Sequence, residues 1–286
     1  MEEVKVYVLA DDYSGYDSEF LAQHGASYLI KMTRSGESVN ILFDTGTYGN
    51  LILENMRLLD IDPKVIDMIV LSHCHYDHTK GLVEIVEKIN KENFPIIAHP
   101  TVFRPHFCKE PVLTHVGMPF KYRKKVEELG GEWVLLRNPT EIAENIFVTG
   151  EVERVTEFEK TPTLKLYTLE NGQLVEDDLK DDVSLVINTE KGIIVISGCS
   201  HAGIINITKH AIRITGSNEV RTVIGGFHLI DADEERIRKT VDMLKQLETR
   251  EIYTGHCTGL KAECLLLKEF GDSFKKLHAG MVITFR

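Results

Sequence analysis

Four side chains that commonly bind metal ions lie within six residues of one another. They are His73, His75, Asp77 and His78, in the run His73-Cys74-His75-Tyr76-Asp77-His78. Imidazole and carboxylate groups are ligands of Zn²⁺ and similar ions, and a bound ion lowers the pKa of its water toward neutrality. The pattern therefore predicts a metal-dependent enzyme, with hydrolysis by a metal-activated water as its default chemistry.

The spacing of these side chains indicates two ions. Residues 66–71 form an apolar run of strand length, so His73 and His75 follow the end of a strand and, two residues apart, point toward one ion. Asp77 and His78 come at the start of the next helix, turned away from the first pair, and are placed to bind a second ion. Histidine clusters also occur as solvated surface residues or helix caps. We expect two divalent ions, Zn²⁺ first, with Fe or Mn as alternatives.

The motif, preceded by Phe43-Asp44-Thr45-Gly46, resembles the metallo-β-lactamase superfamily. Two later segments, 196–201 and 254–257, extend the resemblance over nearly the whole chain. The resemblance implies an α/β fold, a four-layer αββα sandwich with a dinuclear metal site between the sheets.

The resemblance also implies a role for each matching residue. His73 and His75 would serve the first metal, and Asp77, His78 and His256 the second. Asp44 would be an acid that orients the imidazoles, as carboxylates outside a ligand set often do.

The chain departs from the family pattern at two positions. Cys199 stands where the family has an aspartate that bridges the metals; it is either a thiolate ligand, which would favour Zn²⁺, or a small buried residue at a tight turn. The third histidine of the family is expected near residues 149–151, where this chain has none. His201 is the candidate to supply that ligand, and Glu151 is the less favoured substitute.

His228 ends the glycine-rich turn Gly225-Gly226-Phe227-His228, which follows a short apolar strand. From such a turn its side chain could contact substrate or transfer a proton, and the alternative is a histidine that satisfies the core. In the hydrolytic scheme Asp77 binds one metal and orients the nucleophile or accepts its proton, and His228 assists the leaving group.

Three functions remain open from the sequence. The first is a metal-dependent hydrolase acting on a small, phosphorylated substrate. The second is a transferase joining a dihydropterin pyrophosphate to a ribofuranosylaminobenzene phosphate, because segments 198–206, 225–229 and 255–259 resemble a subgroup of dihydropterin-type synthases. The third is a non-catalytic metal-binding scaffold.

The positions of apolar residues predict strands that alternate with helices, arranged as one domain over residues 1–286 with an insertion at about 100–140. The insertion, read as a loop or lid, is rich in basic and aromatic residues that could clamp a phosphorylated aromatic substrate, or could form a solvated loop. Strands are expected at 4–10, 26–33, 39–44, 66–71, 94–98, 133–136, 146–149, 164–169, 184–188, 192–197, 222–224, 252–254 and 282–285. Helices are expected at 50–59, 79–90, 201–214, 234–247 and 260–270.

The composition excludes several classes of protein. With 286 residues, of which 43% are hydrophobic and 27% charged, the chain can bury a full core. The net charge of −11 argues against a nucleic-acid binder. The chain lacks a bilayer-spanning apolar run, a signal peptide and regularly spaced cysteines, so a cytoplasmic protein with reduced thiols is expected. The oligomeric state is not predicted.

Overall fold

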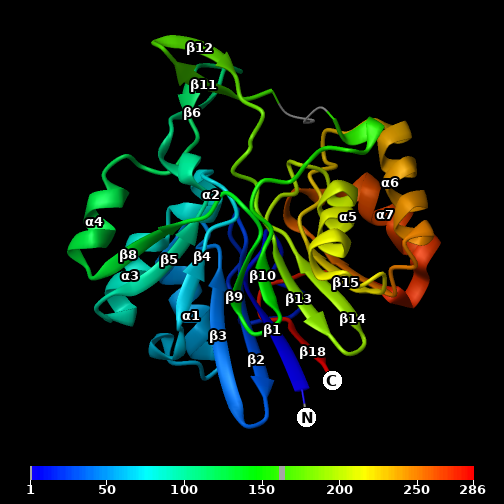
Figure 1. Cartoon of the computed structure of the whole chain (residues 1–286), viewed down its shortest axis with the longest axis horizontal. Helices are drawn as coiled ribbons and strands as arrows, with labels where there is room; N and C mark the ends of the chain where they lie inside the picture. The colour runs from blue at the N-terminus through cyan, green and yellow to red at the C-terminus, as the bar shows by residue number, and fades with distance from the viewer. Residues whose placement is uncertain (1, 161–164) are drawn as a thin grey trace. The chain divides into compact units, whose positions relative to one another are not determined.

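The computed structural model describes residues 2–160 and 165–286, and it shows a mixed α/β protein that divides into two compact units (Figure 1). The first unit comprises Met1–Leu136, Tyr167–Val175 and His278–Arg286, and the second comprises Arg137–Leu166 and Glu176–Leu277. Each unit contains a seven-stranded sheet. The expectation of an α/β fold is confirmed.

The large sheet of the first unit is antiparallel on one side and parallel on the other. Strands β18, β1, β2 and β3 pair antiparallel, whereas β3, β4, β5 and β8 pair in parallel. In spatial order the strands are β18 (Val282–Phe285), β1 (Glu2–Ala10), β2 (Ser27–Arg34), β3 (Glu37–Phe43), β4 (Met68–Val70), β5 (Phe94–Ala98) and β8 (Gly131–Leu135). The strand expected at 282–285 therefore has the predicted bounds, and it completes the first sheet beside β1.

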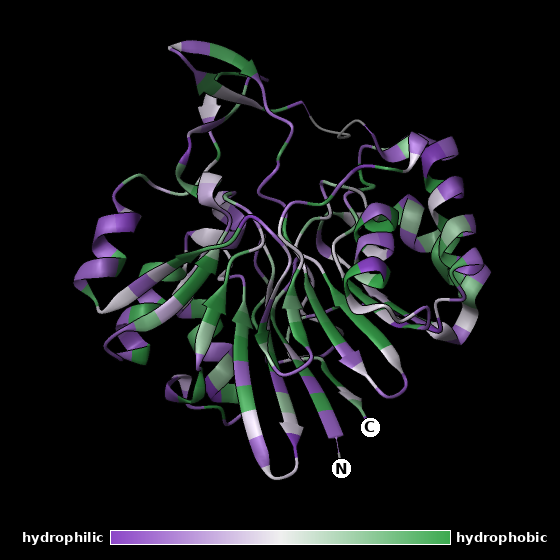
Figure 2. Cartoon of the chain, in the orientation of Figure 1, coloured by the Kyte–Doolittle hydropathy of each residue, from purple (hydrophilic) through white to green (hydrophobic). Residues whose placement is uncertain are grey.

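Helices of the first unit cover one face of this sheet. Helix α1 (Gly49–Leu58) contacts β1, α4 (Tyr122–Glu128) contacts β8, and α3 (Leu82–Ile89) contacts both helices. Their apolar side chains share one buried cluster with strand residues such as Leu42 and Ile69. The strands are accordingly coloured mostly as hydrophobic, whereas the helices carry hydrophilic residues on their outer sides (Figure 2). This core fixes the end of β4, from which the histidine motif begins.

The segment expected as an insertion is partly regular. Residues 131–135 form the edge strand β8 of the large sheet. A small separate sheet has the order β12-β11-β6-β7, with β6 (His106–Cys108), β7 (Thr114–His115), β11 (Tyr167–Glu170) and β12 (Gln173–Glu176). The strand predicted at 164–169 is represented by β11, and its first residue, Leu164, lies outside the described residues.

The sheet of the second unit repeats the same plan. Its antiparallel strands come first along the chain, and the parallel pairs β14–β15, β15–β16 and β16–β17 follow. The strands are β9 (Thr140–Ala143), β10 (Ile146–Val148), β13 (Leu185–Thr189), β14 (Gly192–Ile196), β15 (Val220–Gly225), β16 (Glu251–Thr254) and β17 (Phe274–Lys276).

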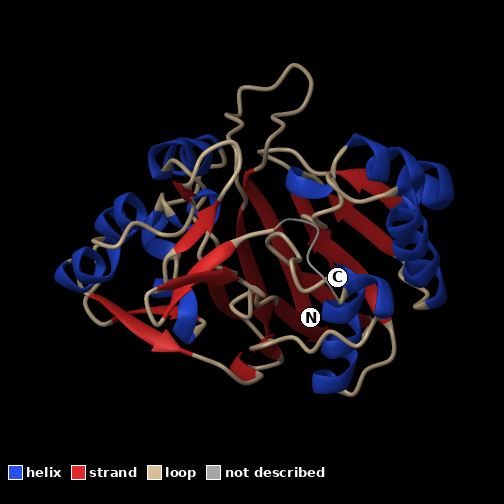
Figure 3. Ribbon diagram, turned by 90° about the horizontal axis from the view of Figure 1, so that it is seen from above, coloured by secondary structure: helices blue, strands red, loops and turns tan. Residues whose placement is uncertain are grey.

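Three helices pack on one face of this second sheet (Figure 3). Helix α5 (Ile204–Thr215) contacts β14 and β15, α6 (Glu234–Gln246) lies between α5 and α7, and α7 (Leu260–Phe270) contacts β17. Their apolar side chains form one buried cluster with the strands. Within the described residues, no helix combines the length and the apolar character needed to cross a membrane.

The predicted site residues follow the carboxyl ends of strands in both units. Asp44 follows β3, the histidine motif follows β4, Cys199 and His201 follow β14, His228 follows β15, and His256 follows β16. In α/β sheets ligands bind outside the carboxyl ends of the parallel strands, where the loops converge. Each unit therefore brings its own set of polar side chains to such an edge.

Candidate metal centre

Asp44 anchors the site in the first unit. The residue is fully buried, has a left-handed backbone with φ of +62°, and donates its N–H to the carbonyl of Val70 in β4 (2.9 Å). Its carboxylate accepts hydrogen bonds from the Ser72 N–H (2.7 Å) and the Ser72 hydroxyl (2.6 Å), and contacts Nδ1 of His78 at 2.6 Å. Asp44 therefore contacts both Ser72 and the predicted ligand His78.

The contacts with Ser72 and Asp44 determine which ring nitrogen of His73 and of His78 carries a hydrogen. The Ser72 hydroxyl donates to Asp44, so its oxygen accepts from Nδ1 of His73, 2.8 Å away. His78 likewise donates from Nδ1 to the Asp44 carboxylate. Both rings then present Nε2 as the position at which imidazole binds a metal.

The donor atoms of the motif converge as metal ligands would. Nε2 of His73 lies 2.9 Å from Nδ1 of His75, and Nε2 of His78 lies 3.4 Å from a carboxylate oxygen of Asp77. Two donors that bind one tetrahedral ion at about 2.0–2.1 Å lie about 3.3 Å apart. The motif therefore fits divalent ions, and Asp77 and His75 are almost as buried as the other two ligand candidates.

His78 lies closer to the first histidine pair than the sequence predicted. Its ring centroid is 4.2 Å from that of His73, because both rings direct Nδ1 toward the same Ser72–Asp44 group. The motif residues Asp77 and His78 belong to a short helix of their own, α2 (Tyr76–Thr79), and the longer helix begins only at Leu82.

The neighbours of His78 strongly change the pKa of its imidazole. Burial lowers the pKa of this imidazole, but the neighbouring carboxylates of Asp44 and Asp77 outweigh the burial and raise the pKa to about 9. In the metal-free protein at neutral pH the ring is therefore protonated. A metal ion that binds Nε2 must displace this proton.

Sequence reasoning missed several neighbours of the motif. Nδ1 of His24 contacts the Asp12 carboxylate at 2.9 Å, and its Nε2 lies 3.6 Å from Asp77. Gly25 makes this approach feasible, since a methyl group there would lie 2.0 Å from the Asp77 carbonyl oxygen. The ring of His106, on β6, lies 5.8 Å from that of His75. These contacts join residues far apart in sequence, so spacing gives no signal for them.

The second unit holds its candidate ligands on two loops that are fastened together. The Ser200 hydroxyl, between Cys199 and His201, donates to the carbonyl of Gly226 (2.6 Å), and the Gly226 N–H donates to the carbonyl of Gly198 (2.9 Å). A methyl group at Gly226 would lie 2.8 Å from that same Gly198 oxygen. The loop after β14 and the loop after β15 therefore touch through their backbones.

Three ligand-type side chains meet on these loops, and we call them the Cys-His-His triad: Cys199, His201 and His228. One candidate ligand atom from each lies within 4.8 Å of the other two; Cys199 and His201 are buried, and His228 is half-buried. The ring centroids of the two histidines are 4.3 Å apart. The structure therefore brings the predicted proton-transfer residue His228 beside two predicted ligands.

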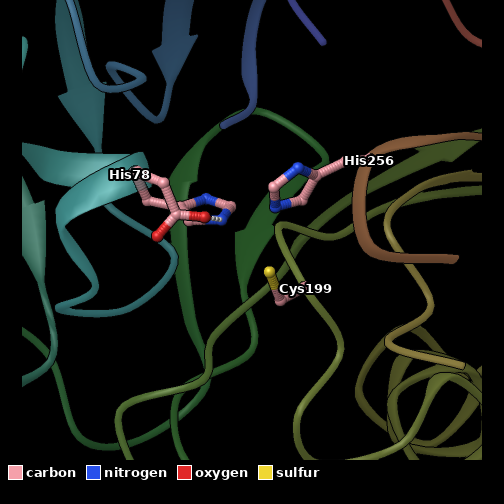
Figure 4. A group of neighbouring side chains, drawn as sticks. His78, Cys199 and His256 are labelled. Carbon is pink, nitrogen blue, oxygen red and sulfur yellow. Dashed lines mark ion pairs between the residues drawn. The ribbon is translucent and has the colours of Figure 1, made fainter. Parts of the chain in front are cut away.

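His256 and Cys257 lie beside this triad. His256 offers a nitrogen within 4.8 Å of the Cys199 sulfur, and Figure 4 shows these two side chains pointing toward one another. Burial raises the pKa of the Cys257 thiol, but a hydrogen bond with Cys199 and the nearby His256 and His228 place that pKa well below its usual range. His228 and His256 both have φ of +44°, a strained backbone that is common at functional sites.

Other residues weighed from the sequence have local partners. Glu151, the less favoured ligand candidate, pairs with Arg137. In the predicted insertion Arg123 stacks over the ring of Phe103 at 4.6 Å, and Lys109 stacks over Tyr167 at 3.6 Å. One basic side chain of the insertion thus stacks on an aromatic ring of the insertion, and another stacks on a ring of β11, outside the insertion.

Comparisons with known proteins give the family and the fold of the chain. The model of the metallo-beta-lactamase superfamily matches residues 22–154. A 7,8-dihydropterin-6-methyl-4-(beta-D-ribofuranosyl)-aminobenzene-5'-phosphate synthase of Methanocaldococcus jannaschii is 51% identical and is aligned over 100% of this chain and 98% of its own. An uncharacterized protein of that organism is 32% identical over 93% of this chain and 94% of its own. A solved metal-dependent hydrolase of the beta-lactamase superfamily is 29% identical, with a TM-score of 0.82 over 98% of both chains.

Proposed function

We propose that this chain, which belongs to the metallo-beta-lactamase superfamily, is a metal-dependent transferase that joins a dihydropterin pyrophosphate to a ribofuranosylaminobenzene phosphate. The chain is an enzyme of that superfamily. One observation carries the choice of reaction, namely the 51% identity to a synthase over the length of both chains. The sequence alone favoured a hydrolase, and this relative supports the transferase alternative better.

The proposed reaction is a substitution at carbon. The amine nitrogen of the aminobenzene forms a bond to the 6-methylene carbon of the pterin. The bond from that carbon to the pyrophosphate oxygen breaks, and the leaving group takes the electron pair. The amine loses one proton to a base, for which Asp77 is our candidate.

The donor sets of the two units are proposed to hold two divalent ions, with Zn²⁺ as the expected metal. In the first unit the ligands would be His73, His75, Asp77 and His78. In the second unit they would be Cys199, His201 and His256. When bound, such ions would stabilise the negative charge that develops on the leaving pyrophosphate.

The protein's own residues would prepare the site for this chemistry. Asp44 and Ser72 hold the rings of His73 and His78 in the orientation that presents Nε2. The ligand candidates of the motif are buried, which strengthens the electrostatic interactions among them.

Hydrolysis remains the second candidate, and the solved metal-dependent hydrolase with a TM-score of 0.82 favours it. In that reaction water replaces the amine as the nucleophile. The same donor sets and the same leaving group would serve, so the two functions differ only in the group that attacks. The synthase relative makes the scaffold alternative the weakest of the three.

The experiment supplies both substrates to the metal-loaded protein and measures the joined product and free pyrophosphate by mass spectrometry. A transferase gives equal amounts of joined product and pyrophosphate, and it releases little pyrophosphate when the aminobenzene substrate is omitted. A hydrolase releases pyrophosphate at the same rate whether or not the aminobenzene substrate is present. The His75→Gln variant, which loses one predicted ligand, is the control for metal-dependent turnover, and activity equal to that of the wild type in this variant contradicts the proposal.

A further inference from the structure

We infer that a pocket of the second unit binds the phosphate of a phosphorylated riboside, and that Arg154 is the residue that recognises this phosphate. The pocket has a volume of about 510 Å³, which is in the range of small-molecule sites. Its walls are residues 151–154, parts of the loop 178–182, Lys160 and Ala202, all of the second unit. The choice of a riboside rests on the proposed function, in which the ribofuranosylaminobenzene substrate carries a phosphate.

The guanidinium of Arg154 forms no ion pair with a carboxylate of residues 2–160 and 165–286. Its Nη2 donates instead to two backbone carbonyls, those of Asp178 (2.6 Å) and His201 (3.3 Å). Its Nε is buried and has no hydrogen-bond partner among the same residues. Guanidinium groups bind phosphate strongly because they offer several N–H donors in one plane together with a positive charge. A phosphate oxygen in the pocket would accept from Nε and face an uncompensated cation.

The acidic side chains of the pocket have partners other than Arg154. Glu151 pairs with Arg137, Glu153 with Arg213, and Asp178 with Lys180, while the Asp182 carboxylate accepts the N–H of Ala202. Three of the four negative charges are therefore compensated by other cations. Lys160 adds a second positive charge at the pocket, because its exposed pair with Glu157 is weak and the amine can turn toward a bound anion at little cost.

The backbone on both sides of the guanidinium holds Arg154 in place. The N–H groups of Val155 and Thr156 donate to the side-chain oxygen of Asn206 (3.0 and 2.8 Å), which ties this segment to helix α5. On the other side Leu179, with φ of +51°, forms a turn directly after the carbonyl that accepts from Arg154. A cation that is already fixed loses little conformational entropy when its ligand binds.

The pocket adjoins the loop that carries two candidate metal ligands of the second unit. Ala202, in its wall, directly follows His201, and the carbonyl of His201 is one of the two that Arg154 contacts. In the proposed substrate the ribose and benzene rings separate the phosphate from the amine that reacts. This phosphate must therefore be held beside the metal-binding loop, because the leaving pyrophosphate would occupy the metals. Arg154 would then determine which substrate binds, without taking part in the bond changes.

A purely structural role for Arg154 predicts a different result. If the side chain only fastened the loops at Asp178 and His201, its loss would weaken the binding of every ligand to the same extent. A residue that binds phosphate instead discriminates between a ligand with a phosphate and the same ligand without one. The ratio of the two affinities separates these roles.

The experiment measures the binding of two ligands to the metal-loaded full chain by isothermal titration calorimetry, in the absence of the pterin. The ligands are the ribofuranosylaminobenzene phosphate and the same molecule without its phosphate. The wild type should bind the phosphorylated ligand more tightly by about 10–100-fold. Arg154→Gln should lose most of this preference and keep its affinity for the other ligand, and Arg154→Lys, which retains the charge, should recover part of it.

Arg250→Gln is the matched control, with circular dichroism to verify the folding of each variant. Arg250 also donates to a backbone carbonyl, that of Lys191 (3.4 Å), but it pairs with Glu219 and lies before β16, at the end of that strand opposite to His256. The substitution removes the same charge from the same unit, and both affinities should equal those of the wild type.

Three results overturn the inference. The first is a wild type that binds both ligands equally, which requires no variant to fold. The second is an Arg154→Gln variant that keeps the full preference for the phosphorylated ligand. The third is an equal loss of both affinities in that variant, which assigns Arg154 a structural role. A preference lost in Arg154→Gln without any joined product in the transferase assay refutes the transferase alone, and joined product without the preference refutes only the phosphate site.

Discussion

Replacing Asp44 with asparagine should change the pH dependence of metal affinity, and the direction follows from His78. In the wild type the His78 pKa of about 9 means that an incoming metal displaces a proton throughout the neutral range. Since pH 7 lies about two units below this pKa, displacing the proton there costs roughly 3 kcal/mol. The Asp44→Asn substitution would retain the size of the side chain and tolerate φ of +62°, but it would remove the nearest negative charge.

The variant should therefore show two opposing effects. Loss of the charged hydrogen-bond acceptor weakens the intrinsic affinity by about 10–100-fold. The lower pKa of His78 removes most of the proton competition, so this deficit should be seen in full above pH 9 and should shrink toward pH 7. Competition with a chromophoric chelator between pH 6.5 and 9.5 measures both effects.

Asp60→Asn is the matched control, because Asp60 also has a left-handed backbone, with φ of +58°, and is exposed. This variant should follow the wild-type curve. Parallel curves for the wild type and Asp44→Asn, separated by a constant factor at every pH, would refute the assignment of the His78 proton to the Asp44 carboxylate.

Three further predictions concern stability and the geometry of the motif. In the metal-free protein His78 contributes stability that is fully present below pH 6.5 and lost as the pH rises through 9, so urea unfolding should show a lower free energy of unfolding at pH 9.5 than at pH 6.5, by about 3 kcal/mol at most. Asn206→Ala should lower the free energy of unfolding by about 2–5 kcal/mol. The reason is that the Asn206 side-chain oxygen accepts hydrogen bonds from the backbone N–H groups of Val155 and Thr156. A loss below about 1 kcal/mol in a urea titration would argue against this role. Gly25→Ala should reduce metal affinity at least tenfold, since the added methyl group forces the backbone of Asp77 to move, and an unchanged chelator titration would contradict this.

The sequence predicted the regular part of the fold well where hydrophobic periodicity was long. Helix α7 and strands β5 and β18 have the predicted bounds, and the buried runs of both sheets were located. Some of the shortest strands, such as β7, β9 and β17, were missed because so short a segment has no measurable period. The predicted helix at 201–214 begins only at Ile204, since Gly203, with φ of +94°, ends the preceding turn.

The site was predictable where its residues are adjacent in sequence. The motif at 73–78 runs from the end of a strand to the start of a helix, so the spacing of its residues already indicates that their side chains lie close together. The contacts of Ser72 with Asp44 and of His24 with Asp77 depend on loops that return from distant positions. The proximity of His228 to Cys199 depends on the parallel pairing of β14 with β15, which single-sequence patterns do not specify.

The pairing of β18 with β1 affects how the chain folds. Val4 lies opposite Phe285 and Tyr7 opposite Val282, so the two strands meet across almost the whole sequence. During synthesis β1 is made first and keeps an unpaired edge until residues 282–285 have been produced. Contacts of such long sequence separation form slowly, and an open strand edge is a template for association with other chains. The first unit should therefore depend more than the second on chaperones during its assembly.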